Sequence, residues 1–401
     1  MKSIDSVVDT LDFNNTQIAF AHKSNKELQK AAWLFSMMNK PWFVNWSSKM
    51  GLWAINNNIP FVETIIKQTI FSQFCGGTSL EDCQLVINKL ANQNVQTILD
   101  YGAEAKHTEQ EFNASMEELL RAINYTSNHQ NVPVVSMKMT GLVKFETLEK
   151  IQANQALTEE EEESYQNLLK RLSFIGQAAE EKSVCLFVDA EESWIQDVID
   201  KLVDNMMQQH NKNKAIVFNT FQMYRHDRLN FLHESYERSR KYQYILGAKL
   251  VRGAYMEKER ARASAMNYPS PIQKDKTATD RDFNLALAFC IEHYQHIASY
   301  NASHNQESNA LQADLILEKG LDKKHPHLNF CQLYGMSDQI TFNLGASGFN
   351  AMKYVPYGQI KEVIPYLIRR AQENTSVKGE MGREYEFILD EQHRRKKIGK
   401  K

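Results

Sequence analysis

The feature that most constrains the fold is a series of eight short apolar runs that alternate with helical stretches from Val95 onward. Near-continuous runs of Val, Ile, Leu and Phe are typical of parallel strands whose outer faces are covered by helices. The runs span residues 97–101, 133–139, 184–190, 215–222, 245–253, 297–304, 328–333 and 351–357. Eight such units predict an α/β fold of the TIM-type (β/α)8 barrel class, although the pattern alone leaves an open doubly wound sheet as an alternative.

Polar side chains gather at the C-terminal ends of these runs. In a parallel barrel, the loops at that end build the active site, so polar residues there are candidates for chemistry. The residues in question are Glu104, Lys138, Asp189, Gln222, Lys249, His304 and Gln332. The sequence therefore predicts a charged and polar cluster at one mouth of the barrel.

Residues 1–94 have helical patterns without strand-like runs, and we expect an N-terminal helical region ahead of a barrel domain at 95–401. Four of the five tryptophans lie there: Trp33, Trp42, Trp46 and Trp53. The favoured interpretation is a helical core packed on the barrel, and the alternative is an aromatic surface for peripheral membrane contact. The basic tail from Arg394 is expected to be a disordered end that could attract an anionic membrane.

Composition excludes several classes of protein. A net charge of −2 and a pI near 6.7 argue against a general nucleic-acid binder. The five cysteines are scattered without paired spacing, which favours a reducing compartment and predicts no metal site. The acidic N-terminus resembles neither a secretory signal nor a mitochondrial presequence. We therefore expect a cytoplasmic, bacterial protein.

The segment 353–374, K-Y-V-P-Y-G-Q-I-K-E-V-I-P-Y-L-I-R-R-A-Q-E-N, carries a distinctive cationic pattern. Helical spacing from Gln359 places Tyr366, Arg369, Arg370 and Glu373 on one helix face. Guanidinium groups bind carboxylates through paired hydrogen bonds, so this face suits a small anionic ligand with an apolar body. The plainer alternative is a solvated arginine pair with Glu373 as its surface partner.

Two further segments favour the ligand-binding interpretation. Residues 249–260, K-L-V-R-G-A-Y-M-E-K-E-R, and residues 184–192, V-C-L-F-V-D-A-E-E, both look like buried strands with charge at their ends. Together with the arginine helix, they resemble the proline dehydrogenase family over roughly residues 100–374. The motifs K-L-V-R-G-A-Y and Y-x-P-Y-G…P-Y-L-x-R-R-A-x-E-N are long and specific to that family.

The resemblance implies a distorted barrel that binds FAD at its mouth and oxidises L-proline. Hydride transfer to the flavin would give Δ1-pyrroline-5-carboxylate, and the electrons would pass to a membrane quinone. This reaction is the first step of proline catabolism to glutamate. The sequence lacks the aldehyde-dehydrogenase half of the bifunctional relatives. The resemblance therefore implies a monofunctional enzyme, with pyrroline-5-carboxylate dehydrogenase as a separate protein, at the inner face of the bacterial membrane.

The resemblance also assigns residues around the substrate. Arg369 and Arg370 would clamp the proline carboxylate, with Lys138 as a third cation. Asp189 would hold its neighbours in place, while Glu104 would pair with Arg369 in the empty site. The pyrroline ring would be walled by Tyr255, Tyr354, Tyr366 and Leu333. The residue that accepts the substrate's nitrogen proton is not assigned.

On the flavin side, Lys249 matches the position whose cation approaches the reactive flavin nitrogen, where many relatives have Arg. Gln222 would bond the edge of the flavin ring, and Glu373 a ribose or adenine group. The remaining flavin contacts implied by the resemblance are Val251, Gly253, Ala254, Ser303, His304 and Asn305.

Other interpretations remain open at this stage. Lys138 and Asp189 could be strand-end charges that satisfy one another, His304 a core histidine, and the tyrosines core aromatics. Hydroxyproline oxidation is a close rival, but relatives with that activity typically have a small residue at the position of Tyr354. A flavin-free aldolase with Lys138 or Lys249 as Schiff-base amine, and an amino-acid sensor without turnover, are alternatives from other classes.

Overall fold

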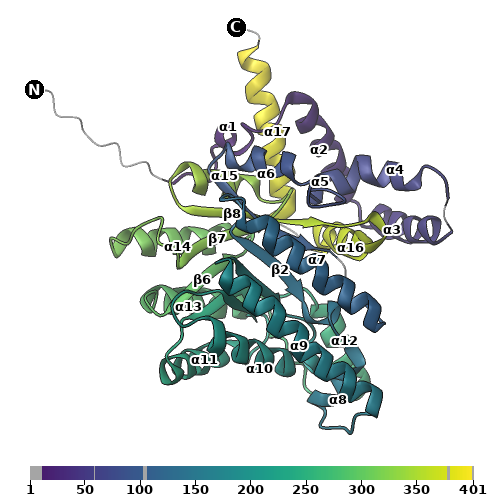
Figure 1. The fold of residues 1–401 in the computed structure, drawn as a ribbon. Helices are drawn as coiled ribbons and strands as arrows, with labels where there is room; N and C mark the ends of the chain where they lie inside the picture. Colours follow the sequence, from purple (N-terminus) through teal and green to yellow (C-terminus); the bar gives the residue numbers. More distant parts are fainter. Residues whose placement is uncertain (1–10, 58, 103–105, 377–379, 400–401) are drawn as a thin grey trace, which may run out of the picture.

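The computed structural model describes residues 11–57, 59–102, 106–376 and 380–399. Eight parallel strands close into a barrel in the order β1 to β8, with β8 pairing β1 (Figure 1). The strands are β1 Val95–Tyr101, β2 Val134–Lys138, β3 Cys185–Asp189, β4 Val217–Gln222, β5 Leu246–Val251, β6 Ile297–Ala302, β7 Leu328–Leu333 and β8 Asn350–Tyr357. The closed barrel is confirmed, and the open sheet is excluded.

Helices cover the outside of the barrel between successive strands (Figure 1). They are α7 Glu109–Ser127, the 3-10 turn η2 Met139–Gly141, α8 Phe145–Gln152, α9 Glu159–Glu181, α10 Ser193–His210, α11 Arg228–Tyr242, α12 Met256–Met266, α13 Lys276–Glu292, α14 Gln306–Glu318 and α15 Asp338–Ala346. Helix α16, Ile360–Ser376, follows the last strand. An apolar core fills the layer between helices and strands, from Leu99 and Val135 to Leu246 and Leu250.

The expected helical N-terminal region is confirmed. Its elements are α1 Thr16–Ala19, α2 Asn25–Met38, α3 Pro41–Asn56, α4 Val62–Ile66, the π-helix η1 Lys67–Phe71, α5 Ser72–Phe74 and α6 Gln84–Ala91. A second apolar cluster joins these helices to α16 through Phe35, Phe74, Val363 and Leu367. The N-terminal helices therefore pack directly on the helix that carries the arginine pair.

Of two expectations about the chain ends, one holds in part and the other is wrong. The core interpretation holds for Phe35 and Met38, which are buried, but all four N-terminal tryptophans are exposed. Residues 394–398 of the basic tail are not a disordered end, because they belong to helix α17, Glu380–Ile398, which packs on α1 and α2. Arg394 and Arg395 are both paired there with the buried carboxylate of Glu391, which the composition of the tail alone could not reveal.

Candidate active site

Strand alternation aims a defined set of side chains into the barrel. On β3, Leu186 and Val188 face the outer helices, whereas Phe187 lies in the interior cluster. Because successive strand residues point to opposite faces, Asp189 points inward like Phe187. The same alternation turns Lys249 inward on β5, since Leu246, Ala248 and Leu250 face outward. Buried strands thus deliver single charged side chains into the mouth of the barrel.

Asp189 is the centre of a hydrogen-bonded cluster drawn from four strands. Its Oδ1 accepts from Lys249 Nζ at 2.6 Å and from Ser136 Oγ at 3.1 Å. Its Oδ2 accepts from Tyr354 Oη at 2.7 Å and from Lys138 Nζ at 3.4 Å. Three of the residues assigned through the family resemblance, Lys138, Lys249 and Tyr354, therefore meet on one carboxylate.

The electrostatics of this cluster favour an ionised Asp189. Burial alone would raise the pKa of Asp189, but the Lys249 and Lys138 ammoniums outweigh burial and hold that pKa below its usual range. Burial and the neighbouring carboxylates raise the pKa of Tyr354 well above its ordinary value, so its phenol remains a donor. Lys138 and Asp189 do form an ion pair, as expected if they were strand-end charges that satisfy one another. The pair belongs to a larger network that also includes Lys249.

An aromatic layer closes the barrel beneath the cluster. The rings of Phe187, Phe218 and Tyr300 meet edge to face, with centroids 4.6 to 5.5 Å apart. The Lys249 ammonium lies 5.2 Å from the centre of the Phe187 ring and 4.7 Å from that of Tyr354. This layer keeps the cation at the mouth and supports it by cation–π attraction.

Two members of the cluster were missed at the sequence level. Ser136 on β2 donates to Asp189, and Asp100 on β1 is buried beside Tyr354 and Lys138. Burial raises the pKa of Asp100 to about 6, although the Lys138 ammonium and the Tyr354 hydroxyl oppose that rise. The alternation of side chains along β1 could have identified Asp100, because Asp100 shares the inward face of its strand with Ile98.

Helix α16 carries the arginine pair over the same mouth. Arg370 and Tyr366 are buried and the Arg370 guanidinium lies 5.1 Å from the Tyr366 ring centre, while Arg369 is half-buried. Leu333 packs against both the cluster that contains Tyr366 and the one that contains Tyr354. The burial of Arg370 contradicts a simple solvated pair. Glu104 and the side chain of Glu373 lie outside the described residues.

The residues assigned to the flavin lie at the ends of β4 and β5. Gln222 is buried and donates through Nε2 to the backbone oxygen of Glu191 at 3.1 Å. Its Oε1 is buried without a hydrogen-bond partner among the described residues. Gly253 has φ +135°, and a Cβ there would meet the Tyr224 ring at 2.4 Å. Beyond the half-buried Val251, Gly253 and Ala254 expose their backbone, while Tyr255 is half-buried at the start of α12.

The third set of flavin residues lies between β6 and α14. His304 Nδ1 is 2.8 Å from Ser337 Oγ, and burial together with nearby cations lowers the pKa of His304 to about 3. The imidazole is therefore neutral. Asn305 caps α14 by accepting from the Ser308 amide, and Ser303 accepts from Arg252. Arg252, the R of K-L-V-R-G-A-Y, is a contact that the sequence reasoning passed over.

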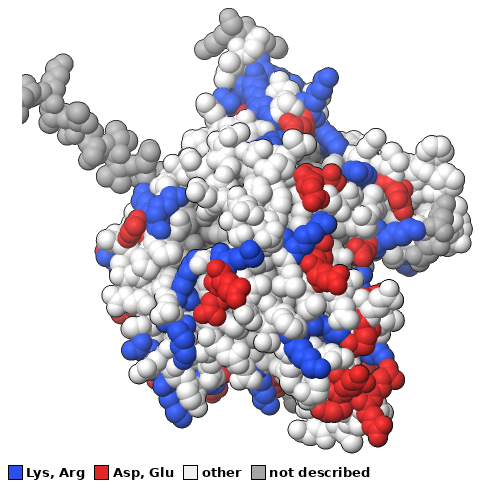
Figure 2. Space-filling view, viewed as in Figure 1, with Lys and Arg blue, Asp and Glu red and all other residues white. Residues whose placement is uncertain are grey.

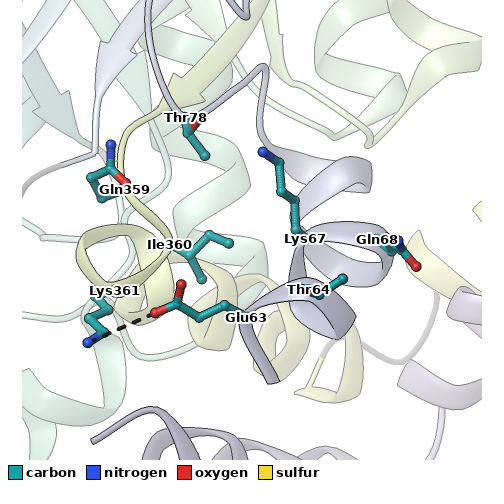
Figure 3. A pocket seen from close by; sticks show the side chains of 8 residues that line it. All are labelled: Glu63, Thr64, Lys67, Gln68, Thr78, Gln359, Ile360 and Lys361. Carbon is teal, nitrogen blue, oxygen red and sulfur yellow. Dashed lines mark ion pairs between the residues drawn. The ribbon is translucent and has the colours of Figure 1, made fainter. Parts of the chain in front are cut away.

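A separate groove of about 540 Å³ lies beside the start of α16 (Figure 3). It is bounded by Glu63 and Lys67 from α4 and η1 and by Gln359 and Lys361 at the start of α16. Glu63 and Lys361 form an ion pair of 3.9 Å across it. None of the predicted site residues that the structure describes lines this groove, so it is distinct from the cluster around Asp189.

Fold and site together define a class of protein. A closed (β/α)8 barrel with ionisable groups converging at the C-terminal ends of its strands is the arrangement of TIM-barrel enzymes. The proline dehydrogenase family model matches residues 83–383. The chain belongs to the proline dehydrogenase family.

Individual relatives agree with this assignment. Mitochondrial proline dehydrogenase 1 of Drosophila melanogaster is 38% identical over 245 residues, covering 59% of this chain and 36% of the fly protein. The carbapenem antibiotics biosynthesis protein CarD of Pectobacterium carotovorum is 32% identical over 324 residues, or 81% of this chain and 84% of CarD. The chain thus spans about a third of the fly relative.

Among solved structures, proline utilization A from Bdellovibrio bacteriovorus, inactivated by N-propargylglycine, superposes with a TM-score of 0.73 at 21% identity. The superposition covers 92% of this chain and 42% of that chain. At this identity, the likeness supports the barrel fold and its N-terminal helices.

Proposed function

We propose that the protein oxidises L-proline to Δ1-pyrroline-5-carboxylate, with FAD as hydride acceptor and a quinone as the final electron acceptor. The observation that carries the proposal is the Asp189 cluster, which joins Lys138, Lys249 and Tyr354 at the end of the barrel. Family membership supplies the substrate class. The product would leave for a separate pyrroline-5-carboxylate dehydrogenase, as the first step of proline catabolism to glutamate.

In this proposal, the cations orient the substrate. Arg369 and Arg370 bind the proline carboxylate through paired hydrogen bonds, and Lys138 adds a point charge. Proline loses a hydride from the ring carbon next to nitrogen and a proton from nitrogen, which leaves the C=N bond of the product. The ring is held between Tyr255, Tyr366 and the two residues already placed at the mouth, Leu333 and Tyr354.

The residues on the flavin side fit FAD in two respects. The buried Oε1 of Gln222 lacks a partner among the described residues, and a flavin ring N–H would satisfy it. The exposed backbone at Gly253 and Ala254 permits close approach of a planar group. FAD, when bound, would supply a two-electron acceptor for the hydride. Lys249 would hold positive charge beside it, and Ser303, His304, Asn305 and Glu373 would contact the rest of the cofactor.

The rival chemistries are less well supported. A Schiff-base aldolase needs an uncharged amine, whereas Lys249 forms a 2.6 Å ion pair with Asp189. Hydroxyproline would need room beside the ring, and Tyr354, which is buried with its hydroxyl bonded to Asp189, would take up that space. Proline is therefore the favoured substrate.

An anaerobic titration with L-proline, followed by flavin absorbance, tests the proposal. We expect stoichiometric bleaching of the flavin band and its recovery when a soluble quinone analogue is added. Binding of proline without bleaching would indicate a sensor rather than an enzyme. Protein that remains colourless after refolding with FAD would overturn the proposed chemistry.

A further inference from the structure

Helix α3 carries an unusual exposed surface. Trp42, Trp46, Met50 and Trp53 are spaced by four, four and three residues and so share one helix face. Their side chains are 67%, 58%, 44% and 56% exposed. Lys49 is exposed on the same face, between Trp46 and Trp53. We call these five residues the α3 tryptophan face.

The rest of the helix is fixed to the protein. Val44 and Ile55 on the opposite side are buried in the core that also contains Phe35 and Leu367. Helix α3 packs against α16, so it is anchored on the helix that carries the arginine pair. A helix with a packed inner face has no internal reason to expose three tryptophans on its outer face.

The surface continues onto the next helix. Phe61 and Ile65, at and within α4, are 80% and 60% exposed, and α4 packs beside α3. In Figure 1, α3 and α4 project from the side of the barrel. In Figure 2, the outer tip of this projection is largely uncharged, while charges of both signs are spread over the barrel helices.

The charges near this surface are one-sided. Between residues 40 and 66, which span α3 and α4, the chain has two lysines, Lys40 and Lys49, and one acid, Glu63. That acid is itself paired with Lys361. The projection is therefore cationic as well as aromatic, which complements the negative surface of an anionic bilayer.

We propose that the α3 tryptophan face lies flat on an anionic membrane surface, with its tryptophans at the headgroup level and Lys40 and Lys49 reaching lipid phosphates. Tryptophan prefers this interfacial depth because its ring is apolar and its indole N–H is a donor. The position of Lys49 favours lipid over a protein partner. Lysine is depleted from the centres of protein interfaces, whereas its flexible stem lets it reach phosphates beside tryptophans in a bilayer.

This inference concerns a surface outside the proposed catalytic site and does not rest on the proposed oxidation. No helix among the described residues is long and apolar enough to cross a bilayer. Docking through α3 would provide contact with lipid without a spanning helix. It would also place the proposed enzyme where a lipid-dissolved quinone is available.

Vesicle binding of the full chain tests the inference without any activity measurement. We expect sedimentation with vesicles of phosphatidylglycerol and phosphatidylethanolamine, and weaker binding to pure phosphatidylcholine. Tryptophan emission should shift to the blue and be quenched by brominated lipid. The face holds three of the five tryptophans, and Trp194 is half-buried on the barrel.

Amino-acid substitutions test whether α3 is the element that contacts the membrane. The triple change Trp42→Ala, Trp46→Ala and Trp53→Ala should weaken binding at least about tenfold. Lys40→Gln with Lys49→Gln should weaken it about 30-fold, because each lysine near an anionic surface contributes about fivefold. The matched control is Phe174→Ala with Leu285→Ala, which removes exposed apolar side chains from α9 and α13. Circular dichroism confirms that each variant is folded.

Two results would overturn the proposal. Equal binding of the wild type and the triple tryptophan variant to anionic vesicles would show that α3 is not the contact. A lipid-free dimer that the triple variant converts to monomer, with vesicle binding absent in both, would show that a second copy of the chain covers this face. Light scattering after size-exclusion chromatography distinguishes this case.

Discussion

Tyr354 on β8 donates a 2.7 Å hydrogen bond to Asp189 on β3, across the mouth of the barrel. The same hydroxyl lies 2.9 Å from Ser136 Oγ on β2. Three strands that are distant in sequence are therefore joined by one phenol. A residue assigned to contact the substrate also orders the carboxylate that holds both lysines.

Tyr354→Phe should separate the two roles of this residue, which are contact with the substrate and the ordering of Asp189. The ring remains, but Asp189 loses a charge-assisted hydrogen bond, so we expect the free energy of unfolding to fall by about 2 kcal/mol. Chemical denaturation measures the change. Tyr357→Phe is the matched control on the same strand, because its hydroxyl bonds Glu118 on the outer face of the barrel. We expect Tyr357→Phe to lose a comparable amount of stability but to keep its proline turnover, in contrast to Tyr354→Phe.

Tyr354→Ser should change the substrate preference. Removing the ring opens space beside the bound substrate, so the ratio of kcat/KM for hydroxyproline to that for proline should rise about tenfold or more. Steady-state kinetics with both substrates provides the measurement. The idea that Tyr354 excludes hydroxyproline fails if this ratio stays the same.

Arg369→Ala and Arg370→Ala should each raise the KM for proline at least about tenfold while flavin stays bound. Lysine at either position should recover part of this loss, because it keeps the charge but not the fork. Arg260→Ala on α12 is a control, since Arg260 is exposed. Unchanged KM in both arginine variants would remove the carboxylate-clamp assignment.

Gly253→Ala should lower the flavin content of the purified protein. Its φ of +135° is unfavourable for a side chain, and the new Cβ would collide with the Tyr224 ring. The control is Gly320→Ala, where φ is +62° but nothing lies within 4 Å of the added Cβ. The control should cost about 1–2 kcal/mol of stability and leave the ratio of flavin to protein intact. Equal flavin content in both variants would contradict a close approach at Gly253.

The barrel could be predicted from the sequence because its strands are buried on both sides and read as eight separate apolar runs. The predicted ends of the strands were less accurate where a polar residue or a glycine ends the hydrogen bonding between neighbouring strands. The run 245–253, for example, ends in the structure at Val251, before the positive φ of Gly253. The capping box of Thr158 and Glu161 at the start of α9 is also visible in the sequence.

Networks were harder to predict than elements. Asp189 and Lys249 were identified singly, but their ion pair depends on the register and closure of the whole barrel. Ser136 and Asp100 were missed because a short polar side chain inside an apolar strand carries no local signal. The exposed tryptophans were misjudged for the opposite reason, since composition favours burial of large aromatics and cannot show which helix faces remain uncovered.

Glu191 provides a test of the electrostatics at the mouth. It follows β3, is buried, and accepts hydrogen bonds from the amide and hydroxyl of Thr140. Burial nevertheless raises its pKa from 4.5 to about 7. Between these values, the folded carboxyl is protonated while the unfolded one is ionised. The unfolded chain then binds fewer protons, so stability must fall as the pH rises.

The free energy of unfolding should therefore be highest, with respect to this group, below pH 4.5 and lower by about 3 kcal/mol above pH 7. Glu191→Gln removes the titration, so its stability should change less between pH 5 and 7 than that of the wild type. Urea denaturation at a series of pH values measures both, with Glu318→Gln on the exposed end of α14 as control. If Glu191→Gln and the wild type show the same slope over this interval, the carboxyl is already ionised in the folded protein and the Thr140 hydrogen bonds outweigh its burial.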